Sequence, residues 1–194
     1  MICAVILAAG ESKRMGTPKL LLPFGKNTII ETIVDTLLQS KIDKILVVLG
    51  SNRDKIKSKI SSRPVLTTAN LRYKEGMLSS IQAGFRALPK KTEAVLVFLG
   101  DQPLIPSSVI DKLIAGYKKS KKGIFIPVFE KKRGHPILVD FKYKPEIEKL
   151  NPDIGLRALV FDHPDDLQEV EVDTPHILKD IDKPEDYKRD LEAH

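Results

Sequence analysis

A loop rich in glycine and basic residues follows the first apolar segment of the chain. The segment 2–7 is short and rich in β-branched residues, which is typical of a buried strand. It leads into a loop that ends at Gly16 and carries Lys13 and Arg14, and Lys19 follows shortly afterwards. Glycine lets the backbone approach a ligand closely, and free N–H groups beside cations suit a polyphosphate. The loop therefore predicts a triphosphate site, with solvated charges on an ordinary connection as the alternative.

The spacing of this loop excludes two common phosphate-binding motifs. A Walker A loop has four residues between its glycines, followed by Lys-Ser or Lys-Thr. Here five residues separate Gly10 from Gly16, and Thr17-Pro18 comes next. The dinucleotide fingerprint Gly-x-Gly-x-x-Gly is absent as well. A triphosphate bound here must therefore be held by a different kind of loop.

A carboxylate follows the apolar segment 94–99. Asp101 comes directly after Gly100, at the end of this predicted strand. Ligands of parallel sheets bind beyond the carboxyl ends of strands, and Mg²⁺ prefers one or two carboxylates together with substrate phosphates. Asp101 is therefore a candidate metal ligand. The alternative is that it caps a helix that begins near Pro106.

Strands and helices alternate along the first two thirds of the chain. This pattern predicts a three-layer α/β/α fold, with a mostly parallel twisted sheet and helices on both faces. After Gly123 the pattern changes, and residues 130–136 predict a small β-excursion within the C-terminal half. We predict strands at 2–7, 44–49, 65–68, 94–99, 124–128, 137–139 and 167–172, and helices at 28–38, 54–60, 78–88, 107–117, 145–150, 154–161 and 184–191.

Composition and length favour one globular domain over residues 1–194. Its single cysteine, Cys3, excludes an internal disulfide and a thiolate metal cluster. No apolar run is long enough to span a bilayer and no signal-peptide layout is present, so we expect a cytoplasmic protein without a membrane partner. The net charge is +6, but the dense run 118–122 has no interleaved aromatic residues. We therefore expect no nucleic-acid partner and an anionic small-molecule substrate.

The first loop closely resembles a family signature. The sequences Leu-Ala-Ala-Gly-x-Ser-x-Arg-Met-Gly at 7–16 and Pro-Lys-Leu at 18–20 are similar to those of the MobA-like nucleotidyltransferases. Within that family they most resemble the molybdenum cofactor cytidylyltransferases. The resemblance implies a Rossmann-like nucleotide-diphospho-sugar transferase fold. It also implies that the loop wraps a nucleoside triphosphate whose phosphates are neutralised by Arg14 and Lys19.

Two acidic motifs match the same family. Gly-Asp-Gln-Pro at 100–103 resembles its metal-binding motif, and residues 180–186 resemble its closing motif Asp-Ile-Asp-Thr-Pro-Glu-Asp. By that resemblance Asp101 and Asp182 are the two Mg²⁺ ligands. Asp182 also has a capping alternative, because Pro184 is a good first residue of a helix. Lys183 replaces the usual threonine and adds a cation near the expected metal.

Three further segments resemble family elements. The segment 73–80 is similar to the Gly-Met-x-x-Ser element that cradles the nucleobase and ribose, although Ser79 and Ser80 also suit a helix cap. Segments 133–136 and 153–157 resemble elements that face the second substrate. The implied nucleotide-binding residues are Leu7, Ala8, Ala9, Gly10, Ser12, Lys13, Arg14, Met15, Gly16, Lys19, Gly76, Ser79 and Ser80. The implied acceptor-binding residues are Gln102, Gly134, His135, Pro136 and Arg157.

The resemblance implies a Mg²⁺-dependent nucleotidyl transfer. An acceptor oxygen attacks the α-phosphorus and pyrophosphate leaves, with Arg14, Lys19 and Asp101 as catalytic residues and no covalent enzyme intermediate. His135 is expected to position the acceptor more than to move a proton. Ala9, where guanylyl members have glycine, favours CTP.

Molybdopterin, or its molybdenum form, is the expected acceptor. The N-terminal half is then nucleotide-binding and the C-terminal half acceptor-facing. A molybdoenzyme or its chaperone is the expected protein partner. Two alternatives stay open: transfer to a sugar, polyol or methylerythritol phosphate, and a non-catalytic module that binds or inserts the molybdenum cofactor.

Overall fold

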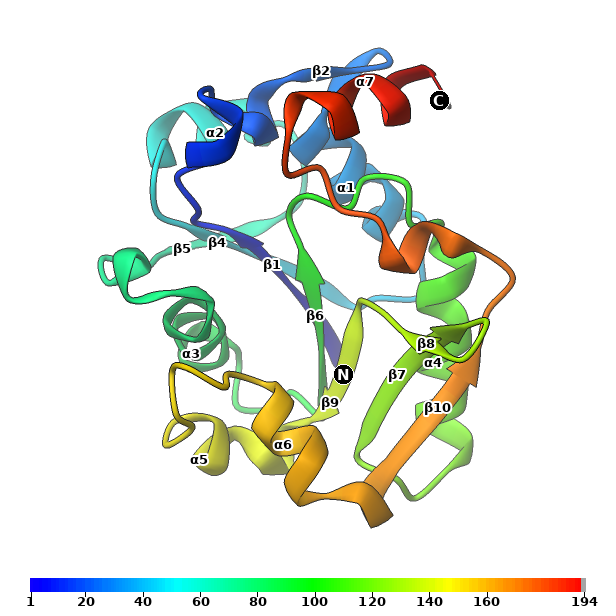
Figure 1. Cartoon of the computed structure of the whole chain (residues 1–194). Coiled ribbons are helices and arrows are strands. Elements are labelled where there is room, and N and C mark those ends of the chain that lie inside the picture. Colours follow the sequence, from blue (N-terminus) through cyan, green and yellow to red (C-terminus); the bar gives the residue numbers. More distant parts are fainter. Residues whose placement is uncertain (193–194) are drawn as a thin grey trace.

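A computed structural model of the chain, which describes residues 1–192, contains an eight-stranded sheet in the order β10-β7-β9-β6-β1-β4-β5, with β8 paired to β7 (Figure 1). The strands of this sheet are β1 (Ile2–Ala8), β4 (Lys44–Leu49), β5 (Leu66–Ala69), β6 (Ala94–Leu99), β7 (Ile124–Phe129), β8 (Lys132–Arg133), β9 (Ile137–Asp140) and β10 (Leu167–Glu171). A separate two-stranded ribbon joins β2 (Pro23–Phe24) to β3 (Asn27–Thr28).

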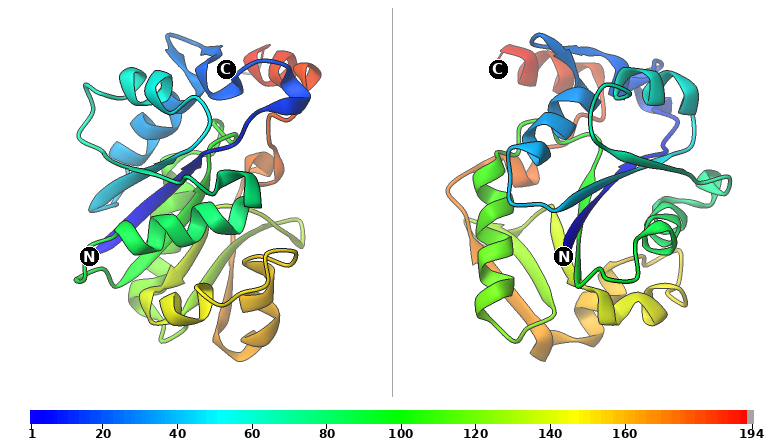
Figure 2. Two further views of the ribbon diagram at one scale, coloured as in Figure 1. Left: turned by 90° about the vertical axis from the view of Figure 1, so that its left-hand side faces the viewer. Right: turned by 180° about the vertical axis from the view of Figure 1, so that it is seen from behind.

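Helices cover both faces of the sheet (Figure 2). The α-helices are α1 (Ile29–Leu38), α2 (Arg53–Lys59), α3 (Met77–Ala87), α4 (Ser107–Lys119), α5 (Lys144–Ile147), α6 (Arg157–Asp162) and α7 (Pro184–Glu192). Short 3-10 helices are η1 (Lys13–Met15), η2 (Lys19–Leu21), η3 (Tyr73–Glu75), η4 (Phe141–Tyr143), η5 (Pro164–Asp166) and η6 (Pro175–Leu178). The helices α1, α2 and α4 pack on one face, and α3, α5 and α6 pack on the other. The predicted three-layer architecture is therefore confirmed.

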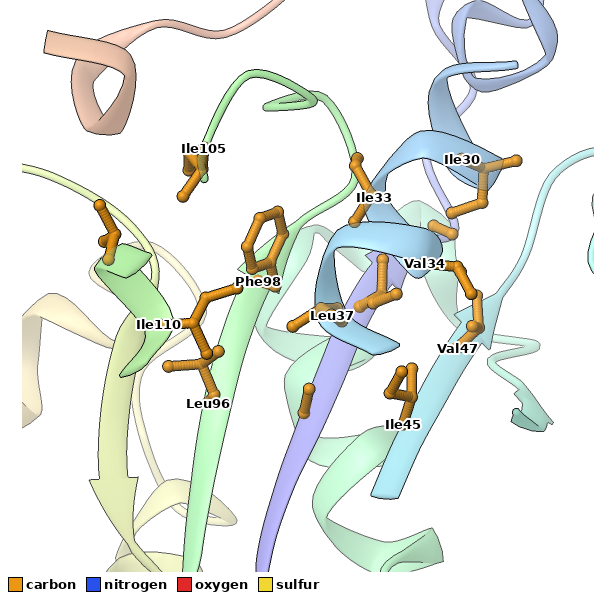
Figure 3. Close-up of a cluster of buried hydrophobic side chains, with 14 of the residues drawn as sticks. Ile30, Ile33, Val34, Leu37, Ile45, Val47, Leu96, Phe98, Ile105 and Ile110 are labelled. Carbon is orange, nitrogen blue, oxygen red and sulfur yellow. The ribbon is translucent and has the colours of Figure 1, made fainter. Parts of the chain in front are cut away.

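The core follows from the spacing of apolar residues in the helices. In α1, Ile33, Val34 and Leu37 lie on one side of the helix and face the sheet (Figure 3). They belong to one buried cluster with Phe98 of β6 and with Val47 of β4, which lies beside Val34. Helix α1 begins after Thr28, whose backbone N–H donates to Glu31 Oε2 at 2.9 Å. In return, the Thr28 side chain accepts from the backbone N–H of Glu31. This pair of contacts is a capping box, and it sets the start of the helix.

The central strands run parallel and end at one edge. β1 pairs in parallel with both β4 and β6, so Leu7 lies beside Leu99 and Ala8 beside Leu49. β9 is antiparallel to both of its neighbours, β6 and β7. The sheet is therefore mixed and mostly parallel, as predicted, and the loops after β1, β4, β5 and β6 share one edge. None of the helices described within residues 1–192 is long and apolar enough to cross a membrane.

Several boundaries differ from the sequence prediction. The helix predicted at 154–161 begins at Arg157, because residues 151–155 form a turn in which Gly155 has a φ of 65°. The N–H groups of Ile154 and Gly155 donate to the carbonyl of Asn151 in this turn. The helix predicted at 145–150 ends at Ile147. The β2–β3 ribbon and the 3-10 helices were not predicted, because such short elements leave little periodicity in a sequence.

Candidate active site

A cavity of about 400 Å³ opens where the strands β1 and β6 end. The loop after β1 forms one wall, and η3 with the start of α3 forms another. The end of β6 and Asp182, which precedes α7, complete the lining. Of the predicted nucleotide-binding residues, those that line it are Leu7, Ala9, Gly10, Ser12, Lys13, Arg14, Lys19, Gly76 and Ser80. The segments predicted to bind the nucleotide thus line the same cavity.

Four predicted nucleotide-binding residues are not among those that line the cavity. Ala8 and Met15 are buried in the core, where their side chains anchor the loop. Gly16 has a φ of 66°, which lets the chain turn at the end of η1. Ser79 Oγ accepts a hydrogen bond from Asn70 Nδ2 and donates to a backbone carbonyl. These four residues therefore shape the loop and the start of α3 without lining the cavity.

Lys19 joins the two predicted metal carboxylates. Its Nζ lies 2.7 Å from Asp101 Oδ2, 3.1 Å from Asp182 Oδ1 and 2.8 Å from the carbonyl oxygen of Ile181. Arg14 Nη1 lies 2.8 Å from the second oxygen of Asp182, Oδ2. Sequence reasoning placed both cations on phosphates. The structure adds that both contact the carboxylates, which brings charges of both signs to one end of the cavity.

Backbone contacts hold the two carboxylates together. Ile181 N donates to the carbonyl oxygen of Asp101 at 2.9 Å, which fixes the segment before α7 against the loop after β6. Asp186 Oδ2 then accepts from the N–H groups of Asp182 and Lys183. The carboxylate oxygens of Asp182 contact Lys19 and Arg14, and its capping alternative stays a prediction. Asp101 does not cap α4, whose N-cap residue is Pro106.

A third carboxylate, Asp180, lies beside the predicted pair. Oxygen atoms of Asp101, Asp180 and Asp182 lie within 4.8 Å of one another. Burial raises the pKa of Asp180, and the negative charges of Asp182 and Asp101 raise it further. Asp180 belongs to the motif at 180–186, but the sequence analysis assigns it no role. Its spacing of two from Asp182, which places both on one side of an extended segment, was the available signal.

This donor set fits a hard divalent cation. Asp101 Oδ1 is buried and has no hydrogen-bond partner among residues 1–192. Divalent cations such as Mg²⁺ and Mn²⁺ favour carboxylate oxygens, and their charge offsets the mutual repulsion of three carboxylates. A cation held by these groups adds positive charge next to bound phosphates.

The loop after β1 presents unpaired backbone donors. The N–H groups of Gly10, Glu11 and Ser12 have no hydrogen-bond partner within the described chain. Ser12 adopts the left-handed conformation with a φ of 55°, and its Oγ accepts from Lys19 N at 3.2 Å, which closes the loop. Free N–H groups in such a turn form a concave site for anions. The loop therefore has the geometry to bind phosphate oxygens.

Two glycines that follow the central strands allow the close approach of these loops. A Cβ on Gly50 would lie 2.6 Å from the carbonyl oxygen of Ala9, and a Cβ on Gly100 would lie 2.6 Å from that of Leu7. Real Cβ atoms essentially never come this close to another heavy atom. Both glycines were visible as the ends of apolar strands, but their role as spacers was not predicted.

The predicted acceptor residues lie outside the residues that line the cavity in the described chain. Gly134 and Pro136 are buried, and a Cβ on Gly134 would lie 2.3 Å from the carbonyl oxygen of Ile177. His135 N donates to that same oxygen at 3.0 Å. Gly134 thus lets the chain pack against η6 and fixes His135 there.

Two of the predicted acceptor residues carry buried, unpartnered side-chain atoms. His135 Nδ1 and Gln102 Oε1 have no partner among residues 1–192. Burial lowers the pKa of His135, the positive charge of Arg157 lowers it further, and the negative charge of Asp101 opposes them. His135 therefore lies within electrostatic reach of Arg157 and of Asp101.

Comparisons with known proteins agree with this geometry. Residues 4–167 match the family described as the MobA-like NTP transferase domain. The molybdenum cofactor cytidylyltransferase of Escherichia coli K12 is 30% identical over 192 residues, which cover 96% of this chain and 93% of that protein. The nicotine blue oxidoreductase of Paenarthrobacter nicotinovorans is 28% identical over 172 residues, which cover 84% and 83%.

Solved structures share the same fold. The crystal structure of Rv0371c from Mycobacterium tuberculosis H37Rv has a TM-score of 0.86 and 25% identity, and the match covers 98% of this chain and 97% of that one. Rv0371c in complex with manganese has a TM-score of 0.84 and 24% identity, with 100% and 99% covered. The fold, the loop after β1 and the match over most of the chain lead to one conclusion: the chain belongs to the MobA-like NTP transferase family and is a nucleotidyltransferase of that family.

Proposed function

We propose that this protein transfers the cytidylyl group of CTP to a phosphate of molybdopterin or its molybdenum form, with release of pyrophosphate. The observation that carries the proposal is the cluster of Lys19, Arg14, Asp101 and Asp182 at one end of a cavity large enough for a nucleotide. In nucleotidyl transfer an acceptor oxygen attacks the α-phosphorus, and negative charge grows on the phosphates and on the leaving pyrophosphate. A cavity with fixed cations at one end stabilises that charge.

Each residue of the cluster has a distinct task in this proposal. The free N–H groups of the loop after β1 bind phosphate oxygens, and Arg14 adds a guanidinium that can bind two oxygens at once. Lys19, whose side chain is 14% exposed, is held by its carboxylate partners next to the phosphates. The bound acceptor and nucleotide are thereby oriented, which is the main work of an enzyme in phosphoryl chemistry.

A divalent cation, Mg²⁺ or Mn²⁺, completes the proposed site. Asp101 and Asp182 would hold it, with Asp180 as an additional ligand, since the oxygens of all three lie together. Rv0371c, which shares the fold, has been solved in complex with manganese. The cation supplies positive charge to the triphosphate, and the lysine and arginine of the cluster supply the rest.

The choice of CTP rests on Ala9. Ala9 lines the cavity, and its methyl group lies beside Gly50. A Cβ built on Gly50 would lie 2.7 Å from this methyl group and 2.8 Å from Tyr73 Cβ. This close packing leaves less room than a glycine at position 9 would, which favours the smaller pyrimidine base. The choice of molybdopterin rests on the likeness to the cytidylyltransferase of Escherichia coli, which spans nearly the whole chain.

The first experiment is a pyrophosphate-release assay with Mg²⁺ or Mn²⁺. CTP, GTP, ATP and UTP are each offered with molybdopterin, with its molybdenum form, and with sugar, polyol and methylerythritol phosphates. We expect turnover with CTP and a molybdopterin acceptor, and loss of turnover in Asp101→Asn. Turnover with a sugar, polyol or methylerythritol phosphate instead would keep the chemistry and replace the acceptor.

An absence of turnover has a separate meaning. If CTP binds but none of these acceptors supports turnover, two explanations remain: an acceptor outside this panel, or a non-catalytic module that binds or inserts the molybdenum cofactor. The likeness to nicotine blue oxidoreductase means that sequence similarity alone does not choose the reaction. The three clustered carboxylates, two of which contact Lys19 and Arg14, favour nucleotidyl transfer, because a cation held there and the two basic side chains would stabilise the negative charge of a triphosphate.

A further inference from the structure

Asn70 is a buried polar residue at the edge of the nucleotide cavity, directly after β5. It is 5% exposed, and its backbone N–H extends the β4–β5 pairing by donating to Leu49 O at 2.7 Å. Its side chain bridges to the start of α3. Nδ2 lies 2.8 Å from Ser79 Oγ and 3.0 Å from Ser80 Oγ, and Oδ1 accepts from Arg72 N at 2.9 Å.

These contacts settle the orientation of the Asn70 amide. Only an oxygen can accept from the backbone N–H of Arg72, so Oδ1 is on that side and the NH₂ group faces both serines. Each hydroxyl therefore receives a hydrogen bond from Asn70 on its oxygen. The hydrogen of each hydroxyl must then point to another acceptor.

The two serines differ in where that hydrogen goes. The Ser79 hydroxyl donates to the carbonyl oxygens of Arg72 and Gly76, at 2.9 and 2.8 Å. Ser80 lines the cavity and is 5% exposed, and its hydroxyl has no acceptor for its hydrogen among residues 1–192. Ser80 is thus left with a hydrogen to donate into the cavity, and Asn70 prevents it from turning that hydrogen inward.

We propose that Asn70 is a positioning residue that fixes the Ser80 hydroxyl as a hydrogen-bond donor to an acceptor atom on the base of the bound nucleotide. This inference rests on the proposed function. The base is the part concerned because of the neighbours of Ser80 in the lining of the cavity. Ser80 lies one turn along α3 from Met77, and Tyr73 and Ala9, which also line the cavity, both lie beside Gly50. The cations Lys19 and Arg14 are instead held by the carboxylates of Asp101 and Asp182. A neutral, partly apolar end suits a base, and a charged end suits phosphates.

The test reverses the hydrogen bond while it preserves the turn. Asn70→Asp keeps an oxygen for Arg72 N and replaces the NH₂ donor by a carboxylate oxygen, so Ser80 donates to residue 70 and offers only lone pairs to the ligand. We expect CTP affinity, measured by calorimetry, to fall about tenfold or more in Asn70→Asp and about tenfold in Ser80→Ala, as for a lost or reversed hydrogen bond. KM for CTP rises by similar factors while kcat changes less.

A double-mutant cycle separates this role from added charge or a damaged fold. Asn70→Asp is introduced once into the wild type and once into Ser80→Ala. The added negative charge is the same in both backgrounds, so its effect on CTP affinity cancels when the two changes are compared. We expect Asn70→Asp to have a much smaller effect when the Ser80 hydroxyl has already been removed. Ribose 5-triphosphate without a base should bind the wild type and Ser80→Ala equally, which places the contact on the base.

A matched control is available at Asn151. Its Oδ1 accepts from Asp153 N at 2.9 Å in the same kind of turn, and it is exposed. Asn151→Asp should leave CTP affinity unchanged. Asn70→Ala serves as a second variant: it frees the Ser80 hydroxyl without reversing it, so a smaller loss of affinity is expected.

The possible outcomes are distinct. Full CTP affinity in Asn70→Asp, or equal effects of that change with and without the Ser80 hydroxyl, overturns the inference and leaves the proposed function intact. Equal losses for CTP and base-free ribose 5-triphosphate in Ser80→Ala also overturn it. If the wild type binds none of the four nucleoside triphosphates, the proposed function fails and this inference fails with it.

Discussion

The ammonium of Lys19 lies 2.7 Å from the carboxylate of Asp101, and both side chains are mostly shielded from solvent, with 14% and 20% exposed. Its remaining hydrogens are directed at Ile181 O and Asp182 Oδ1. All three donors of the ammonium are therefore satisfied by oxygen atoms from two distant segments. Lys19 consequently holds the site together as well as supplying charge to it.

Lys19→Met should damage both stability and turnover. Loss of the ammonium leaves Asp101 and Asp182 facing each other, with only Arg14 to compensate them, which we expect to cost about 1–3 kcal/mol because the pair is part-buried. Turnover should fall by about 100-fold or more. Urea unfolding and pyrophosphate release measure the two effects. Lys26→Met, on the separate β2–β3 turn, is the control, and equal loss in both variants would contradict this role.

Ala9→Gly should relax the preference for CTP. Removal of the methyl opens space beside Gly50 and Tyr73, so a purine nucleotide should gain relative to CTP by about 10-fold, the usual scale for one methyl group in a binding pocket. The ratio of kcat/KM for CTP and GTP measures this change. An unchanged ratio would rule out the steric explanation of base choice.

Gly100→Ala should be poorly tolerated. The new Cβ would lie 2.6 Å from the carbonyl oxygen of Leu7, so the ends of β1 and β6 must separate and Asp101 must move with them. We expect a loss of about 1–3 kcal/mol in unfolding free energy, together with lower turnover. Gly10→Ala provides the contrast in unfolding experiments, since a Cβ there meets nothing within 4 Å. Equal stability of the two variants would show that the strand ends are not tightly packed.

Asp180→Asn should weaken Mn²⁺ binding. The change keeps the shape of the side chain and removes one negative charge from the carboxylate cluster, so Mn²⁺ affinity should fall about 10-fold, as for loss of an outer or weak ligand. Electron paramagnetic resonance of free Mn²⁺ gives this affinity without a catalytic assay. Asp162→Asn, at the exposed end of helix α6, is the matched control. Identical Mn²⁺ affinity in both variants would remove Asp180 from the metal site.

Glu31 predicts a pH dependence of stability. Burial alone raises its pKa, but hydrogen bonds from Thr28 and Arg63 outweigh burial, so the pKa of Glu31 in the folded protein is below its usual value. A carboxyl with a lowered folded pKa stabilises the protein above its unfolded pKa, about 4.3, and this contribution is lost as pH falls through the folded pKa. The urea midpoint should therefore drop as pH falls below about 4.3, and drop less in Glu31→Gln. The same fall of the urea midpoint with pH in the wild type and in Glu31→Gln would contradict this role of Glu31.

Much of this architecture was predictable because its elements are regular. The alternation of buried strands and amphipathic helices indicated the layers, and the strand ends at Leu7 and Leu99 indicated the edge that holds the cavity. In long segments such as α1 and β6, many residues follow the same hydrophobic pattern, so the type of element can be predicted. The loop signature and the two acidic motifs indicated the family, which the match to residues 4–167 confirms.

The missed features depend on contacts between distant residues. Nothing local to Lys19 indicates that it contacts Asp182, 163 positions away, and nothing local to Asn70 indicates that it orders two serines on the next helix. Gly50 and Gly100 are ordinary strand ends until the neighbouring carbonyls are in place. The roles predicted for Gln102, His135 and Arg157 stay predictions, since these residues lie outside the residues that line the nucleotide cavity.

The contact between Lys19 and the segment at 181–182 also bears on how the protein folds. Its partners are 162 and 163 residues away in sequence, whereas α1 and its capping box form between near neighbours. Closing so long a loop is entropically costly and occurs only after much of the intervening chain is ordered. Recovery of nucleotide binding during refolding should therefore lag behind recovery of helical circular dichroism, so the protein becomes competent only at the end of its folding.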